Sequence, residues 1–203
     1  MSDSVPTRVW YACYGSNLSR DRFMDYISSA RDTTAPSEYV PWRLPYALYF
    51  SRSSTQWDGG SVAFITPTRE EPVSLARAYL ITFEQFTDVA CRENGRKAGC
   101  TGLSIDLAAA KKHGHSRMLK TGWYSELIYL GERNGYPVLT FTSPEDLRGE
   151  DTRCPSPNYL RKIHSGLQED HGFTVSESVS YLKDRPGIKG NIGEGELVGI
   201  LGE

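Results

Sequence analysis

The sequence has little that would cross-link the chain. Only four of its 203 residues are cysteine, at positions 13, 91, 100 and 154, and no two of them form a C-x-x-C pair. Their spacing does not match a structural zinc site. A chain of this length buries most of the surface that its unfolded form exposes, so it needs no disulfide or metal. We therefore expect four free thiols and a cytoplasmic location.

Long apolar runs and an excess of one charge are also missing. No apolar segment approaches the roughly 20 residues that cross a bilayer. The opening residues are polar and lack the basic and apolar regions of a secretory signal. Lys and Arg together number 23 and Asp and Glu 25, a formal net charge of -2, whereas nucleic-acid binding shows as a basic excess. We expect neither a membrane nor a nucleic-acid partner.

Runs of β-branched, aromatic or alternating apolar residues make up much of the chain. They predict strands over residues 9–14, 44–50, 62–64, 75–81, 123–130 and 136–142. Residues 131–135, between the last two runs, are expected to form a hairpin turn. The polar, glycine-containing residues 96–120 predict at most one short strand, near residues 103–107.

Capping patterns predict the helices. Thr82 with Gln85 and Thr174 with Glu177 match capping boxes, and Ser156-Pro157 is a typical helix start. Helices are expected over residues 18–27, 82–94, 156–172 and 174–186. Strands and helices do not alternate regularly, which argues against a doubly wound parallel sheet. We expect an α+β fold, a small mixed β-barrel or strongly curved sheet flanked by helices. It should form a single domain spanning residues 1–203, with residues 186–203 loosely ordered.

The segment Tyr14-Gly15-Ser16-Asn17-Leu18 is the first candidate site. A glycine at the end of a buried strand lets the backbone approach a ligand closely. The amides that follow, at the mouth of a helix, favour an anion such as a substrate carboxylate. The simpler alternative is a strand-to-helix turn in which Asn17 caps the helix. Walker and nucleophile-elbow patterns are absent, so neither a phosphate loop nor a Ser16 nucleophile is indicated.

Glu93 is the second candidate. Phe86, Ala90 and Glu93 are spaced i, i+4 and i+7, which places this carboxyl group on the apolar edge of the predicted helix. A carboxyl group that faces the core must be paired, hydrogen-bonded or neutral. Desolvation raises the pKa of such a group toward the range that is useful for proton transfer. A salt bridge to Arg96 or Lys97 explains the position equally well from the sequence alone.

Other chemistries have weaker support. Cys13 or Cys91 could serve a cysteine enzyme with one of the four histidines, but no nucleophile signature accompanies either. The histidines are His113, His115, His164 and His171. The pair His113 and His115 has no carboxylate or cysteine close by in sequence, so we expect solvated surface and no metal site. Basic residues near this pair are expected to be a solvated edge. They are Lys111, Lys112, Arg117 and Lys120.

Residues 11–18 resemble the Y-x-A-Y-G-S-N-L signature of the γ-glutamylcyclotransferases. Three further segments follow in the order that the family shows. They are Trp57-Asp58-Gly59-Gly60 for a W-x-G-G turn, Glu93 for the catalytic glutamate, and Ser156-Pro157-Asn158-Tyr159 for S-P-x-Y. The resemblance covers roughly residues 9–167. Two departures stand out: residues 89–94 differ from the L-D-x-x-E-G pattern, and Leu139 stands near a position where some members carry tyrosine.

The resemblance implies an enzyme that cyclises a γ-glutamyl group, releasing 5-oxoproline and an amine or amino acid. Glu93 would be the general acid/base, and Tyr14, Gly15, Ser16, Asn17, Leu18 and Tyr159 would bind the substrate. No metal or cofactor is implied, the partner is a small γ-glutamyl compound, and the chain is a monomer or homodimer. Two alternatives stay open: a catalytically silent module that binds a small metabolite, and an enzyme that removes a γ-glutamyl protecting group in a biosynthetic pathway.

Overall fold

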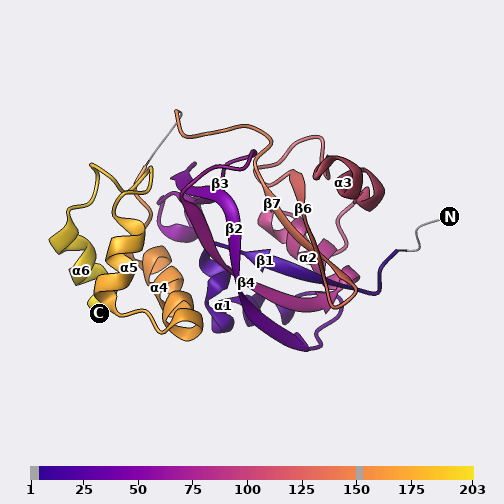
Figure 1. The fold of residues 1–203 in the computed structure, drawn as a ribbon, viewed down its shortest axis with the longest axis horizontal. Coiled ribbons are helices and arrows are strands. Elements are labelled where there is room, and N and C mark those ends of the chain that lie inside the picture. The colour runs from indigo at the N-terminus through magenta and orange to yellow at the C-terminus, as the bar shows by residue number, and fades with distance from the viewer. Residues whose placement is uncertain (1–4, 150–152) are drawn as a thin grey trace. The chain divides into compact units, whose positions relative to one another are not determined.

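The computed structural model describes residues 5–149 and 153–203 (Figure 1). The strands are β1 (Arg8–Cys13), β2 (Glu38–Ser51), β3 (Val62–Ile65), β4 (Val73–Thr82), β5 (His115–Arg117), β6 (Glu126–Arg133) and β7 (Tyr136–Thr142). The α-helices are α1 (Arg20–Ile27), α2 (Phe83–Glu93), α3 (Leu107–His113), α4 (Pro157–His171), α5 (Val175–Leu182) and α6 (Glu194–Gly202). Two short 3-10 helices are η1 (Ser16–Leu18) and η2 (Thr55–Trp57).

The described chain divides into two compact units. The first unit comprises residues 5–13, 24–42 and 77–144, and the second comprises residues 14–23, 43–76 and 145–203 without 150–152. The chain passes between the units inside α1, β2 and β4, so these elements contribute residues to both.

The strands follow the hydrogen-bonded order β3-β2-β4-β1-β7-β6-β5 in one curled, mixed sheet. β1 pairs with β4 antiparallel and with β7 parallel, whereas β2–β3, β5–β6 and β6–β7 are antiparallel. This confirms the expected α+β class with a curved sheet. The β-barrel alternative is wrong, because β3 and β5 end the order of the described strands and do not close it.

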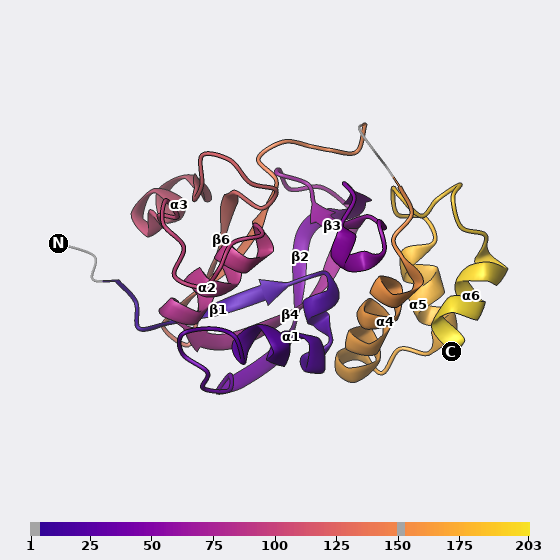
Figure 2. The ribbon, with the colours of Figure 1, turned by 180° about the vertical axis from the view of Figure 1, so that it is seen from behind.

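The core of the first unit lies between α2 and one face of β1 and β7, and Figure 2 shows α2 running along β1. Side chains alternate between the faces of a strand, so Tyr11 and Phe141 reach the same face. Their rings lie 5.2 Å apart, and Phe86 of α2 lies 5.8 Å from Tyr11. The expected capping box starts α2: the Thr82 side chain accepts from the Gln85 amide, and the Gln85 side chain accepts from the Thr82 amide. Two reciprocal bonds therefore set the start of the helix that carries Glu93.

In the second unit, α4, α5 and α6 lie together, drawn from orange to yellow in Figure 1. Ser156 caps α4 as expected, because its side chain accepts from the Tyr159 amide, and Gly172 ends the helix with a positive φ. Residues 186–203 were expected to be loosely ordered, yet they include α6. Leu197 and Leu201 of α6 are buried, and their burial offsets the entropy of ordering this glycine-rich segment.

The segment 96–120 differs from its prediction. Residues 103–106 form no strand, while α3 and the short strand β5 follow. The Asp106 side chain accepts from the Ala109 amide, and Gly114 ends α3 with a φ of 86°. The polar composition of the segment hid a helix that its own caps define.

The hairpin between β6 and β7 is confirmed, but its turn is shorter than expected. Asn134 and Gly135 alone form it, with φ values of 51° and 78° that suit a two-residue turn. A register shift between Tyr129 and Glu132 leaves Gly131 inside β6, although the sequence placed it in the turn. No helix formed by the described residues combines the length and apolar character needed to traverse a lipid bilayer.

Candidate active site

The bend after β1 belongs to the second unit and forms the 3-10 turn η1. The Leu18 amide donates to the Gly15 carbonyl at 3.0 Å, and the Ser19 amide to the Ser16 carbonyl at 3.1 Å. Ser16, Asn17 and Leu18 are buried. Because α1 starts at Arg20, Ser19 and not Asn17 stands at its N-cap position. The amides of Leu18 and Ser19 are therefore engaged within the turn itself, so the Leu18 amide does not serve the predicted anion cradle.

Gly15 lies directly against Tyr159. A Cβ atom on residue 15 would stand 2.7 Å from the Tyr159 hydroxyl and 3.3 Å from the Ala63 Cβ atom. The backbone N–H of Ala63 donates to the same hydroxyl at 3.0 Å, and Tyr159 is 3 % exposed. The backbone of β3 therefore holds the tyrosine hydroxyl against the one position in the bend that has no side chain.

The W-x-G-G turn packs on the same tyrosine. The rings of Trp57 and Tyr159 lie 4.8 Å apart at 76°, and the guanidinium of Arg22 lies 5.2 Å from the centre of the Trp57 ring. A Cβ atom on Gly60 would stand 2.4 Å from the Ser156 amide nitrogen. The second unit thus brings together three motifs that are far apart in sequence, around residues 14–18, 57–60 and 156–159.

Glu93 belongs to the first unit, as the last residue of α2, and its exposure is intermediate. The next residue fixes the end of the helix. The Asn94 side chain donates to the Ala90 and Tyr124 carbonyls, each at 2.9 Å, and accepts from the Tyr124 amide at 3.0 Å. The backbone next to Glu93 is therefore attached to the segment that leads into β6.

Arg96 was one of the two salt-bridge partners considered for Glu93. Its guanidinium donates to the carbonyl oxygens of Thr101 and Thr121, at 3.2 and 3.5 Å. These bonds give Arg96 a structural role in holding the loop that follows α2.

Comparison with known proteins adds evidence on the fold. No protein-family model matches the chain. "Histone deacetylase 5" of Arabidopsis thaliana is 29 % identical over 206 residues, which is 89 % of this chain but 31 % of that protein, so the chain spans less than a third of its length. A solved structure titled "Gamma-glutamyl cyclotransferase" superposes with a TM-score of 0.52 at 18 % identity, covering 97 % of this chain and 99 % of the other.

This chain has the γ-glutamylcyclotransferase fold. Two further solved structures share it. The human uncharacterized protein loc79017 gives a TM-score of 0.54 at 18 % identity, covering 98 % of this chain and all of the other. YkqA of Bacillus subtilis gives 0.50 at 16 % identity, covering 89 % of this chain and 56 % of the other. At such identities the likeness establishes the architecture and leaves the chemistry to be argued from the residues.

In this γ-glutamylcyclotransferase fold, the expectation of four free thiols is wrong for two of the cysteines. Cys91 and Cys100 form a disulfide, with their Cα atoms 5.9 Å apart. The expectation rested on chain length and on the absence of a C-x-x-C pair. Neither reveals that the chain turns back after α2 and brings residues 91 and 100 together. In that turn the Arg96 amide donates to the Cys91 carbonyl.

The disulfide also removes Cys91 as a nucleophile in this oxidised form. Cys13 remains free and buried, with its sulfur 3.4 Å from the Arg77 carbonyl oxygen. A buried thiol in such a setting is typical of inert core, which further weakens the cysteine-enzyme alternative.

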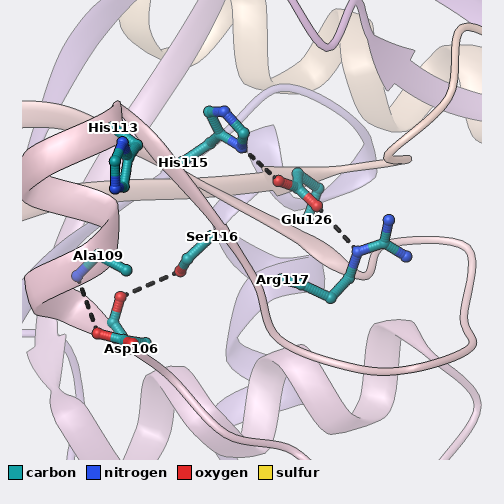
Figure 3. A pocket seen from close by; sticks show the side chains of 7 residues that line it. All are labelled: Asp106, Ala109, His113, His115, Ser116, Arg117 and Glu126. Carbon is teal, nitrogen blue, oxygen red and sulfur yellow. Dashed lines mark hydrogen bonds and ion pairs between the residues drawn. The ribbon is translucent and has the colours of Figure 1, made fainter.

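The histidine pair near α3 has a carboxylate neighbour that the sequence did not reveal. His115 Nδ1 lies 2.6 Å from an oxygen of Glu126, which arrives from the adjacent strand β6 (Figure 3). Within residues 5–149 and 153–203, no group of three or more His, Cys, Asp or Glu side chains is placed to hold a metal ion. Both histidines are exposed, as expected of solvated surface, but His115 is also paired with Glu126.

Proposed function

We propose that this protein is an enzyme that cyclises a γ-glutamyl amide or peptide, releasing 5-oxoproline and an amine or amino acid. The observation that carries the proposal is the meeting of Gly15 and Tyr159 in the second unit, where the W-x-G-G turn packs on the same tyrosine. Three motifs of one family signature would have no reason to converge if each matched by chance. The fold itself agrees with the proposal but does not carry it.

In the proposed reaction the free α-amine of the γ-glutamyl group attacks its own γ-carbonyl carbon. A new C–N bond closes the five-membered ring, and the original amide C–N bond breaks. The attack is intramolecular, so the protein gains most by holding the substrate in a folded, near-attack conformation. The amides of Gly15, Ser16 and Asn17, with flanking Tyr14 and Leu18, would bind the substrate carboxylate and polarise the carbonyl.

A proton must move during this reaction. An α-ammonium group with a pKa of ~8 is mostly protonated at neutral pH and cannot attack until it loses a proton. Glu93 would accept that proton and return it to the leaving nitrogen, so that no net acid or base is consumed. Tyr159 would orient the substrate through its hydroxyl. The Asn94 contacts and the disulfide support this role, because they hold the helix end that carries Glu93.

Deacetylation, which the name of the Arabidopsis relative suggests for that protein, is not extended to this chain. The chain matches 31 % of that protein. No feature of the described residues favours it over γ-glutamyl cyclisation.

The test is to incubate the protein with γ-glutamyl amino acids, γ-glutamyl amines and glutathione, and to measure 5-oxoproline. We expect product with at least one class of substrate. Glu93→Gln should lower kcat by about 10²–10⁴-fold, because general acid/base groups typically contribute that much. Glu84→Gln, an exposed glutamate in the first turn of the same helix, is the matched control and should leave kcat unchanged.

The same experiment separates the alternatives. Saturable binding of these compounds without 5-oxoproline would replace the enzyme by a metabolite-binding module. Turnover confined to one elaborated γ-glutamyl intermediate would indicate a deprotecting enzyme. A Glu93→Gln variant that melts early but turns over normally at low temperature would give the residue a structural role and contradict the proposal.

A further inference from the structure

The loop closed by the Cys91–Cys100 disulfide contains the proposed acid/base Glu93. The two cysteines are nine positions apart, and Glu93 follows Cys91 by two residues. Cys91 lies in the last turn of α2, where its carbonyl oxygen accepts from the amides of Asn94 and Arg96 at 3.1 and 3.0 Å. The disulfide is therefore attached to the residue around which the helix end folds, next to Glu93.

Hydrogen bonds on both sides of Cys100 hold it near α2 independently of the disulfide. The Gly99 amide donates at 2.8 Å to the carboxylate of Asp88, which is buried in α2. The Arg96 guanidinium donates to the Thr101 carbonyl at 3.2 Å. These bonds involve no sulfur atom, so reduction of the disulfide does not itself break them. The two thiols then stay close together, and their high effective concentration favours closing the bond again.

The two cysteines also differ in their access to solvent. Cys91 is 2 % exposed, whereas the exposure of Cys100 is intermediate, so a small thiol reaches Cys100 more easily. Its thiolate attacks the Cys100 sulfur, forms a mixed disulfide there and releases the Cys91 thiolate, which takes up a proton. A second small thiolate attacks the small-thiol sulfur of the mixed disulfide and releases Cys100. Two electrons pass to the protein, and the small thiols leave as their own disulfide.

We propose that the Cys91–Cys100 pair is a redox switch that controls the activity of Glu93. The switch rests on the proposed γ-glutamyl cyclisation. In the oxidised form, the disulfide ties the last turn of α2 to the segment that follows it and restricts the backbone next to Glu93. Reduction removes this covalent restraint, so the turn opens more often and Glu93 spends less time where proton transfer requires it. The oxidised form is therefore the more active one.

Hydrogen exchange tests the restraint without any substrate. Wild type is compared in its oxidised form and after reduction with dithiothreitol. We expect about 10–100-fold faster exchange of the amides of Asn94, Gly95 and Arg96 after reduction, because closing a short loop suppresses its open forms by about that factor. Replacing both Cys91 and Cys100 by alanine should give the fast exchange with and without dithiothreitol. If that variant fails to fold, the two forms of wild type still give the comparison.

The activity test measures 5-oxoproline formation by the same proteins. We expect kcat to fall about three- to tenfold on reduction with little change in KM, because the loss concerns the position of Glu93 and not the binding of substrate. Hydroxyethyl disulfide, which carries no γ-glutamyl group, should restore kcat by the reverse exchange. Cys154→Ala, at a cysteine outside the disulfide, is the matched control and should keep the full response.

The outcomes separate the switch from the proposed function. Equal exchange in the two forms of wild type would overturn the switch. So would 5-oxoproline formation at the same kcat in both forms, or at a higher kcat after reduction, and either result would leave the proposed cyclisation intact. Absence of 5-oxoproline in both forms would contradict the proposed function and, with it, the switch.

Discussion

At the scale of single residues, the contact between Gly15 and Tyr159 explains two motif positions at once. Gly15 has a negative φ of -107°, so its backbone does not require glycine for conformational reasons. The space beside it does, because the tyrosine hydroxyl occupies the place of a Cβ atom. The position of the Tyr159 hydroxyl therefore explains why residue 15 is glycine, and this explanation does not depend on which ligand binds the bend.

A double-mutant cycle tests this dependence. Gly15→Ala alone should destabilise the protein, because its Cβ atom meets the Tyr159 hydroxyl at 2.7 Å. Tyr159→Phe alone should cost about 1–3 kcal/mol, because the Ala63 amide loses its acceptor. In the Tyr159→Phe background, Gly15→Ala should cost less, since the nearest remaining ring atom is 3.8 Å away. Urea unfolding of the four proteins measures the coupling, and strictly additive losses would contradict the packing argument.

His164 should make the stability of the protein depend on pH. It is buried in α4, with Nδ1 2.8 Å from the Ser178 hydroxyl of α5, and burial lowers the pKa of its imidazole below 6.5. The unfolded chain therefore binds a proton at a higher pH than the folded protein does. The stability that this histidine contributes is complete above pH ~6.5 and is lost as the pH falls through the lowered folded-state value.

We expect the free energy of unfolding to decrease below pH ~6.5 and His164→Gln to flatten part of that decrease. His113→Gln, at an exposed position, is the control and should keep the wild-type slope. Denaturant titrations between pH 5 and 8 provide the measurement. Identical slopes in wild type and His164→Gln would remove His164 as the cause.

At the scale of elements, several contacts restrain the end of α2, next to the proposed acid/base Glu93. The Cys91–Cys100 disulfide closes a loop that contains Glu93 and Asn94, and Asn94 is bonded to Tyr124. Asp88 of the same helix also accepts from the Gly99 amide at 2.8 Å and from the Arg31 guanidinium. Several independent contacts therefore restrain the loop that follows Glu93.

Replacing both Cys91 and Cys100 by alanine should lower stability by about 2–3 kcal/mol, the range for a short disulfide loop. Because other contacts restrain the loop, the variant should still fold. Thermal melts with and without a reductant measure the effect. The reductant should lower the melting temperature of wild type and leave that of the variant unchanged. Cys154→Ala, at a free cysteine, is the control. A wild-type melting temperature that is the same with and without the reductant would show that the disulfide contributes nothing to stability.

At the scale of the whole molecule, the described chain has two compact units but not two separate sets of elements. α1, β2 and β4 each contribute residues to both units. If one unit unfolded alone, the shared strands β2 and β4 would be disrupted partway along their length, and the other unit would lose strand residues next to its own. This continuity favours the single-domain prediction, which stays a prediction.

We therefore expect one cooperative unfolding transition. Calorimetry should give equal calorimetric and van't Hoff enthalpies, and fluorescence and circular dichroism should report the same midpoint. Two resolved transitions, or midpoints that differ between probes, would mean that the units unfold separately.

Local interactions account for what the sequence alone determined about this protein. Both capping boxes, the start of α4 and the strand β4 could be predicted, because each depends on residues a few positions apart. The motif segments could be named for the same reason. Contacts between distant residues were decided only by the tertiary structure: Tyr159 against Gly15, Cys91 bonded to Cys100, and Glu126 between His115 and Arg117. No local pattern encodes them, because they depend on how strands and helices pack after they have formed.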